Sequence, residues 1–265
     1  MFRSSAIAHA DPNELAKTEA IDFARRLVPL WQATLGTELL GAYLIGSMAH
    51  AGFSRRYSDV DMALVTATGL PPRVHDGLQS QAIALSADWG SRISIFWADR
   101  HFSLGRFPPL DRIDYLDHAL LLMERERIRP TRPTLTDVRE YLRGAPLTSW
   151  VDRARSFAAA ERLEPEDRKA YLRALLYPAR FCFSWMTGRM GSNDEAVAFV
   201  NERTPARLDV FLIKRALELR RDAADPDVLF CARTVLISQI DACVTLIRDE
   251  SALARPSPMD FRNGH

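Results

Sequence analysis

The spacing of apolar residues changes near residue 146, and this change limits the chain to a fold with two different parts. Before it, three short apolar stretches, residues 39–45, 59–66 and 93–97, alternate with segments that have helical spacing. After it, residues 150–248 place apolar side chains three and four positions apart, and no segment alternates as a strand does. The pattern predicts an α/β (α+β) chain in which a small mixed sheet precedes a helical bundle.

The division that follows from this pattern has three parts. We expect a mixed α/β domain over residues 1–145, a helical domain over residues 146–254 and a frayed, Pro- and Ser-rich tail over residues 255–265.

Local signals place several helix ends within this division. Asp11 and Pro12 are typical of a helix start, and we expect that helix to continue to about Leu35. A helix that opens at Pro72 is expected to end at Gly90, and another is expected from Asp111, followed by a weak strand near Ile128.

Two further signals fall in the second half of the chain. Ser192 and Glu195 have the spacing of a capping box, which predicts that a helix begins there. Pro178 lies inside an otherwise helical pattern and predicts a kink or break. Thr204-Pro205 and Asp225-Pro226 are expected to separate later helices.

The charge balance and the cysteines limit the partners and the location. Lys plus Arg number 35 and Asp plus Glu 34, so the chain lacks the excess of positive charge that holds long nucleic acid. The three cysteines, Cys182, Cys231 and Cys243, lie in apolar helical patterns and are interpreted as buried thiols in a reducing compartment. No apolar segment reaches the length of a membrane span, so we expect a cytoplasmic protein without a membrane partner.

The most specific stretch contains two carboxylates. Residues 59–66 form an apolar segment that starts with Asp59-Val60-Asp61, and the two-residue period of a strand places Asp59 and Asp61 on one face. Two carboxylates on one face repel each other unless a cation lies between them. Mg²⁺ binds through one or two carboxylates together with phosphate oxygens, so we interpret Asp59 and Asp61 as metal ligands.

The residues before this pair suggest a phosphate site. Gly46 and Ser47 end the first apolar stretch and offer small side chains, backbone N–H groups and a hydroxyl. Arg55 and Arg56, between Gly-Ser and the carboxylates, could neutralise the β and γ phosphates or the leaving pyrophosphate. The parts together describe a triphosphate held by a metal ion.

This arrangement resembles the nucleotidyltransferase superfamily, whose signature is an apolar strand, Gly-Ser, a linker and Asp-x-Asp on the next strand. Gly46, Ser47, Asp59 and Asp61 match that signature, and Ser58 directly precedes the carboxylates as a further nucleotide-binding candidate. The resemblance implies that Asp59 and Asp61 are catalytic as well as metal-binding.

The second half is similar to the helical domain of the streptomycin and spectinomycin adenylyltransferases. The matching stretches are residues 185–189, Asp194 with Ala196 after it, and residues 202–205. The resemblance implies that this domain closes over the nucleotide, that Asp194 meets an amine of the substrate and that Arg203 contacts a phosphate.

One expected carboxylate is missing. The family uses a third carboxylate on a later strand as metal ligand or general base, and alternation places Ser94 at that position. A serine hydroxyl is a poor base and a weak metal ligand. The substitutes that remain open are Asp99, Asp111, Asp114 and Asp117.

The resemblance therefore implies transfer of a nucleotidyl group, in particular adenylyl from ATP with Mg²⁺, to a hydroxyl of a small molecule such as an aminoglycoside. The loss of the carboxylate at Ser94 leaves a second interpretation open, a catalytically impaired nucleotide-binding protein that acts as a sensor or interaction module. A third is a minimal toxin-type nucleotidyltransferase that modifies a protein or RNA, and the large helical half argues against it.

Overall fold

The computed structural model describes residues 11–203 and 208–248, so Thr204-Pro205 and the expected tail from residue 255 lie outside the described residues. Helix α1 (Pro12–Leu35) begins where the side chain of Asp11 accepts a hydrogen bond from the Asn13 N–H at 2.9 Å. Gly36 ends it with a φ of 57°, which favours glycine. Both predicted ends of this helix are confirmed.

A four-stranded mixed sheet follows, with the strand order β3-β2-β1-β4. The strands are β1 (Leu39–Leu44), β2 (Val60–Thr66), β3 (Ile93–Asp99) and β4 (Leu120–Glu124). Strand β1 pairs antiparallel with β2 and β4, whereas β2 and β3 run parallel. The mixed sheet confirms the expected fold class.

Two strand predictions need correction. The last strand is β4 at residues 120–124 and not near Ile128, because pairing with β1 selects the apolar run next to the helix before it. Strand β2 begins at Val60, so Asp59 is the last residue of the preceding loop.

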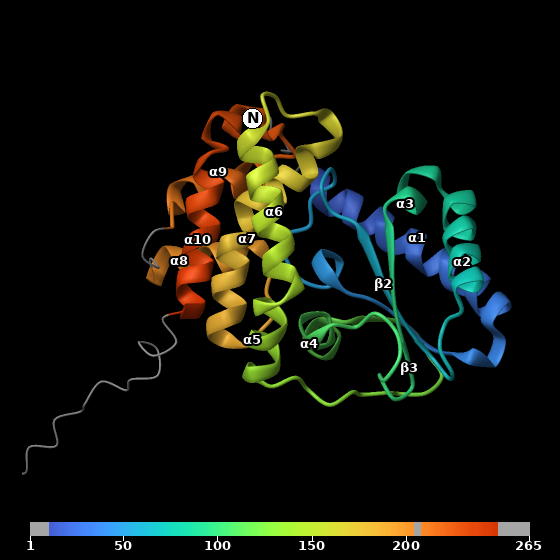
Figure 1. Cartoon of the computed structure of the whole chain (residues 1–265). Coiled ribbons are helices and arrows are strands. Elements are labelled where there is room, and N and C mark those ends of the chain that lie inside the picture. The colour runs from blue at the N-terminus through green and yellow to red at the C-terminus, as the bar shows by residue number, and fades with distance from the viewer. Residues whose placement is uncertain (1–10, 204–207, 249–265) are drawn as a thin grey trace, which may run out of the picture.

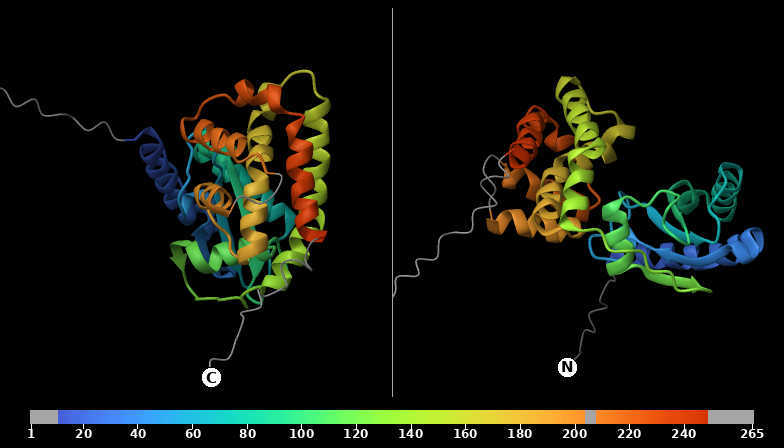
Figure 2. Two further views of the ribbon diagram at one scale, coloured as in Figure 1. Left: turned by 90° about the vertical axis from the view of Figure 1, so that its left-hand side faces the viewer. Right: turned by 60° about the horizontal axis from the view of Figure 1, so that its bottom comes forward.

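Helices cover one face of this sheet (Figures 1 and 2). Helices α1, α2 (Pro72–Leu85) and α3 (Ala87–Ser91) pack there, and Trp31, Leu78 and Met62 belong to their common core. The expected single helix up to Gly90 is interrupted at Ser86, whose side chain caps α3 by accepting from the Trp89 N–H.

The opposite face of the sheet packs against the loop around Phe102 and Phe107 and against helix α4 (Pro109–His118). Tyr43 of β1 and Tyr115 of α4 meet edge to face, with 5.0 Å between ring centroids. This contact fixes α4 beside the end of β1, and α4 is therefore placed to reach the Gly46-Ser47 turn.

The second half contains helices, and none of its described residues forms a strand. They are α5 (Leu135–Arg143), α6 (Ala145–Ala159), α7 (Arg168–Thr187), α8 (Asn193–Arg203), α9 (Val210–Arg221) and α10 (Val235–Arg248). Short 3-10 turns complete the described elements: η1 (Gly36–Glu38), η2 (Gly46–Met48), η3 (Pro165–Asp167) and η4 (Pro226–Ala232).

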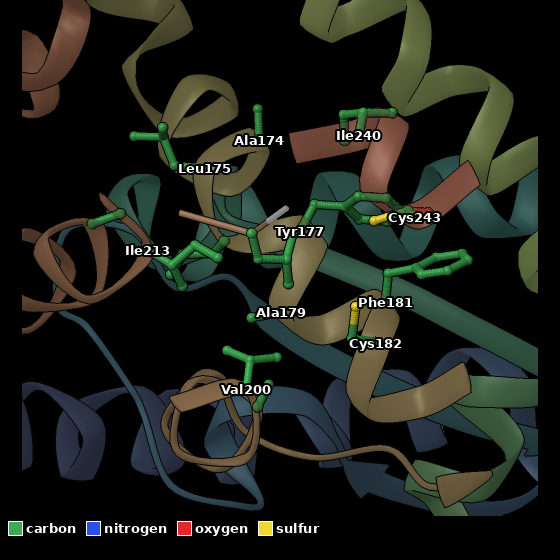
Figure 3. Packing of buried hydrophobic residues seen from close by; sticks show 14 of the residues in the cluster. Ala174, Leu175, Tyr177, Ala179, Phe181, Cys182, Val200, Ile213, Ile240 and Cys243 are labelled. Carbon is green, nitrogen blue, oxygen red and sulfur yellow. The ribbon is translucent and has the colours of Figure 1, made fainter. Parts of the chain in front are cut away.

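Helix α7 is the centre of this half, and α5, α6, α8, α9 and α10 pack around it (Figures 1 and 2). Tyr177 and Phe181 of α7 lie near Cys243 and Ile240 of α10 in the core (Figure 3). Helix α7 continues through Pro178, so no break occurs at the residue where a kink or break was predicted.

Two other sequence signals can be checked directly. The capping box before α8 is confirmed, because the Ser192 N–H donates to Glu195 at 2.8 Å and the Glu195 N–H donates to the Ser192 hydroxyl at 3.1 Å. Cys182 and Cys243 are buried as expected, whereas Cys231 is exposed in η4, so its interpretation as a buried thiol was wrong.

Within the described ranges, no single helix is both long and apolar enough to cross a membrane. One bent pair, Pro226–Ala232 with Val235–Arg248, meets those criteria of length and composition when its two helices are taken together.

Candidate active site

A cavity of about 220 Å³, the central pocket, lies between the sheet and the helical half. One wall comes from the end of β1, the start of β2 and helix α4, and the other comes from α7, α9 and residues 190–193. Gly46, Ser47, Ser58, Asp59 and Asp61 all line it. The structure thus brings together the residues that carried the resemblance to nucleotidyltransferases.

The Gly46 position is shaped by Asp61. Gly46 has a φ of 66°, and a Cβ atom placed on it would lie 2.5 Å from Oδ2 of Asp61. The Ile45 N–H also donates to the Asp61 carbonyl at 3.0 Å. Only glycine fits this conformation and this approach without displacing the carboxylate.

Asp59 links the two halves of the molecule. Its carboxylate accepts hydrogen bonds from Lys169 and, at 2.9 Å, from Arg173. Both of these cationic residues belong to α7. Burial lowers the pKa of the Lys169 ammonium despite this partner. The sheet and the helical half are therefore joined by charge at the site where a metal ion was predicted.

Among the described residues, no ion pair or hydrogen bond engages the Asp61 carboxylate, and the charge of Arg173 compensates its burial only in part. Burial, followed by the negative charge of Asp59, raises the pKa of Asp61 to about 7. A cation in the pocket would relieve this repulsion.

Ser94, the residue that the sequence analysis assigned to the third carboxylate position, does not line the central pocket. Ser94 of β3 stands opposite Asp61 in the parallel register of β2 and β3, so the two side chains share a face of the sheet. Two residues further along that face, Phe96 lines the central pocket. On this face β3 therefore offers a hydroxyl and a ring and no carboxylate.

Asp99 does not replace it. The side chain is 5% exposed and accepts hydrogen bonds of 2.7 Å from the backbone N–H groups of both Ser103 and Leu104. Asp99 therefore organises the loop after β3 and does not line the pocket. Asp117 is likewise engaged elsewhere, because Arg132 donates to it at 2.8 Å.

Two carboxylates from α4 do line the pocket, and the sequence had offered them only as open alternatives. Asp114 is 1% exposed and accepts hydrogen bonds from the Gly46 N–H at 2.6 Å and from Nδ1 of His118 at 3.0 Å. The hydrogen bond to Asp114 raises the pKa of His118. Asp111, one helical turn earlier, has a pKa raised to about 6 by burial and by the nearby charge of Asp114.

Three arginines of the helical half complete the pocket, and sequence reasoning missed all of them. Arg173 and Arg180 of α7 are seven residues apart, which puts them on one face of the helix, and Arg220 comes from α9. Arg220 donates to the Ser58 hydroxyl at 3.0 Å. Burial lowers the pKa of Arg180, and burial together with Arg180 and Arg173 lowers that of Arg220 to about 10.

A comparison with solved structures finds a similar fold. Spectinomycin adenyltransferase AAD(9) from Enterococcus faecialis, solved with ATP and spectinomycin, superimposes with a TM-score of 0.61. The chain has the same fold as that enzyme. The two sequences are 13% identical, and the match covers 86% of this chain and 99% of the other. No protein-family model and no curated protein matches the chain.

Two loop arginines lie outside the central pocket of this adenyltransferase fold. Arg56 forms an ion pair with Asp225 and donates to the Ala223 carbonyl at 3.2 Å, so it holds η4 and the loop before it. Arg55 is exposed and does not line the pocket, and its backbone N–H donates to the side chain of Asn13 at 2.9 Å.

Two residues named from the resemblance also lie outside the pocket. Arg203 is exposed and stacks on Phe199, with 4.6 Å from the guanidinium carbon to the ring centroid. Asp194 pairs with Arg221, whose Nε donates at 2.9 Å. The neighbouring Asn193 lines the pocket instead.

Proposed function

We propose that the chain binds a nucleoside triphosphate with Mg²⁺ and transfers its nucleotidyl group, in particular adenylyl from ATP, to a hydroxyl of a small molecule. The observation that carries the proposal is one pocket that joins the Gly46-Ser47 turn, Asp59 and Asp61 to the arginines of the helical half. Carboxylates suit a metal ion and arginines suit phosphates, and a metal-bound triphosphate needs both.

Two carboxylates of the central pocket, Asp59 and Asp61, are suited to bind Mg²⁺. Among the described residues, no three His, Cys, Asp or Glu side chains form a ready metal cluster. Mg²⁺ does not require one, because it commonly binds one or two carboxylates and completes its shell with phosphate oxygens and water. Asp59 and Asp61 would hold the ion, which would neutralise phosphate charge during the displacement.

The cationic side chains would bind the triphosphate. Arg180 and Arg220 line the pocket opposite Asp61, and low exposure strengthens their attraction for phosphate oxygens. Ser47 offers a hydroxyl at the turn, where it contacts the Ser58 hydroxyl at 2.9 Å. The turn amide of Gly46 already donates to Asp114, so side chains carry more of the phosphate binding than the sequence suggested.

The acceptor implied by the resemblance is an aminoglycoside-like molecule. That class needs a carboxylate to meet an amine. Oδ1 of Asp194 is engaged by Arg221, whereas its buried Oδ2 has no hydrogen-bond partner among the described residues, and Asp194 does not line the central pocket. A cytoplasmic location is part of the same proposal, and the three free cysteines are consistent with a reducing compartment.

A second candidate function is a nucleotide-binding protein without transfer activity. The observation in its favour is Ser94, which stands beside Asp61 where the family has a carboxylate. A sensor of this kind would bind Mg-ATP and release no pyrophosphate.

Calorimetric titration of Mg-ATP and measurement of pyrophosphate release separate the two candidates. We expect binding that requires Mg²⁺ and that disappears when Asp59 and Asp61 are both changed to Ala. Arg132→Ala serves as a control, because that side chain pairs with Asp117 outside the central pocket. Undiminished metal-dependent binding by the double variant would contradict both functions.

A further inference from the structure

A second cavity lies beside the central pocket, and aromatic side chains line much of it. This aromatic pocket measures about 170 Å³ and lies under α4, α5, α6 and α7. Rings dominate its walls, which include Tyr141, Trp150, Tyr177, Phe181 and Phe183. Apolar cavities of about 150 Å³ bind molecules as large as benzene, so this one has room for a single ring.

The walls are held in place by their own packing. Trp150 of α6 stacks on Tyr177 of α7, with ring centroids 4.9 Å apart, and Tyr177 lies 5.9 Å from Phe181. Tyr177 and Phe181 also pack toward α10 in the core of the helical half (Figure 3). A pocket lined by stacked rings is preformed and favours a flat apolar group.

The two pockets meet at charged side chains. Asp111, Arg173 and Arg180 line both of them, and Asp111 is the one carboxylate among the described residues that borders both cavities. No hydrogen bond or ion pair engages the Asp111 carboxylate within the described part of the chain, whereas Asp114 is held by Gly46 and His118. Two arginines at the same boundary disfavour a positively charged ligand.

We propose that the aromatic pocket is the acceptor site, that the acceptor carries a ring-sized apolar group and no positive charge, and that its hydroxyl meets Asp111. The proposal rests on the proposed transferase function. The acceptor oxygen forms a bond to the α-phosphorus, the bond from that phosphorus to the bridging oxygen breaks, and pyrophosphate leaves. The hydroxyl proton passes to a carboxylate oxygen of Asp111, the role that Ser94 cannot fill.

Binding is tested first, with benzyl alcohol as the probe and the full chain carrying Mg²⁺ and a non-hydrolysable ATP analogue. Nuclear magnetic resonance titration should give saturable binding of benzyl alcohol at millimolar concentration. A cationic probe with the same ring, 4-(aminomethyl)benzyl alcohol, should bind at least several-fold more weakly. Benzyl alcohol binding that is present in the nucleotide-free protein and lost when the ATP analogue is added would overturn the proposal, because the pocket would then hold the nucleobase.

Matched tryptophan variants locate the site. Leu110→Trp places a larger side chain at the edge of the aromatic pocket and should abolish benzyl alcohol binding while Mg-ATP binding persists. Leu116→Trp lies on the same helix, is similarly half-buried and borders neither pocket, so it should bind the probe as the wild type does. Equal binding by both variants would overturn the assignment.

Transfer is tested with Asp111→Asn, and Asp117→Asn on the same helix is the control. With benzyl alcohol as acceptor and saturating Mg-ATP, pyrophosphate release by Asp111→Asn should fall about a hundredfold to ten-thousandfold, while the control keeps the wild-type rate. An unchanged rate would overturn the role of Asp111. A wild type that binds both ligands and transfers to other hydroxyl compounds, but not to benzyl alcohol, would overturn the acceptor site. A wild type that binds Mg-ATP and transfers to no hydroxyl compound would refute the proposed transferase function instead.

Discussion

Asp114 of α4 accepts a 2.6 Å hydrogen bond from the backbone N–H of Gly46, although the two residues are 68 positions apart. The turn that marks the nucleotide site is thus held by a helix that the motif does not contain. Since Asp114 also accepts from His118, one buried carboxylate determines the conformation of both elements.

Replacing Asp114 should therefore destabilise the protein. Asp114→Ala leaves the Gly46 N–H without its acceptor, and an unsatisfied buried donor costs about 1–3 kcal/mol. Urea unfolding should show this loss. Asp117→Ala, which removes only an exposed pair with Arg132, should cost less than about 1 kcal/mol. Equal losses in the two variants would contradict the role given to Asp114.

Two glycine substitutions should have opposite effects. Gly46→Ala forces a side chain into a φ of 66° and against Asp61, so we expect a loss of about 1–2 kcal/mol and weaker Mg-ATP binding. Gly77→Ala in the exposed part of α2 meets nothing within 4 Å and should stabilise the protein by about 1 kcal/mol. Thermal unfolding and calorimetry measure both effects. A Gly46→Ala protein with wild-type affinity would show that the turn does not shape the site.

Stability should fall as the pH rises through the titration of Asp61. The pKa of Asp61 is about 7 in the folded protein and about 3.9 in an unfolded chain, so the folded state binds more protons between pH 4 and 7. The free energy of unfolding therefore decreases with rising pH across that window. Asp61→Asn abolishes this contribution.

Urea unfolding of the metal-free protein at pH 5 and pH 8 checks the sign. Asp61→Asn should gain stability relative to the wild type at pH 8, on the order of a few kcal/mol, and the gain should shrink at pH 5. Asp99→Asn is a contrast to Asp61→Asn, because hydrogen bonds from the loop stabilise the charged form of Asp99, whereas burial destabilises the charged form of Asp61. A gain for Asp61→Asn that is independent of pH would contradict the raised pKa.

A carboxylate introduced at Ser94 should strengthen the response to metal. Ser94→Asp places a third carboxylate on the face shared with Asp61, so the metal-free protein should become less stable and Mg²⁺ should stabilise it more than it does the wild type. Ser94→Asn is the uncharged control of similar size. Thermal unfolding with increasing Mg²⁺ measures the effect. An identical Mg²⁺ response in both variants would place Ser94 away from the metal.

The sequence by itself determined the features that depend on neighbours along the chain. The Asp11 cap and the capping box of Ser192 and Glu195 follow from fixed local geometry. The Gly-Ser turn and the two carboxylates were assigned to one site by their order and spacing, through the resemblance to a known signature.

The tertiary structure decided everything that depends on which distant segments meet. Asp111, Arg180 and Arg220 have the spacing of ordinary charged residues on helices, and only the packing of α4, α7 and α9 directs them into one pocket. Arg56 and Asp194 were plausible ligands by position, yet Asp225 and Arg221 lie close enough to neutralise them. A charged side chain finds its partner through space, and spacing along the chain fixes that partner only within a helical turn or a pair of strands.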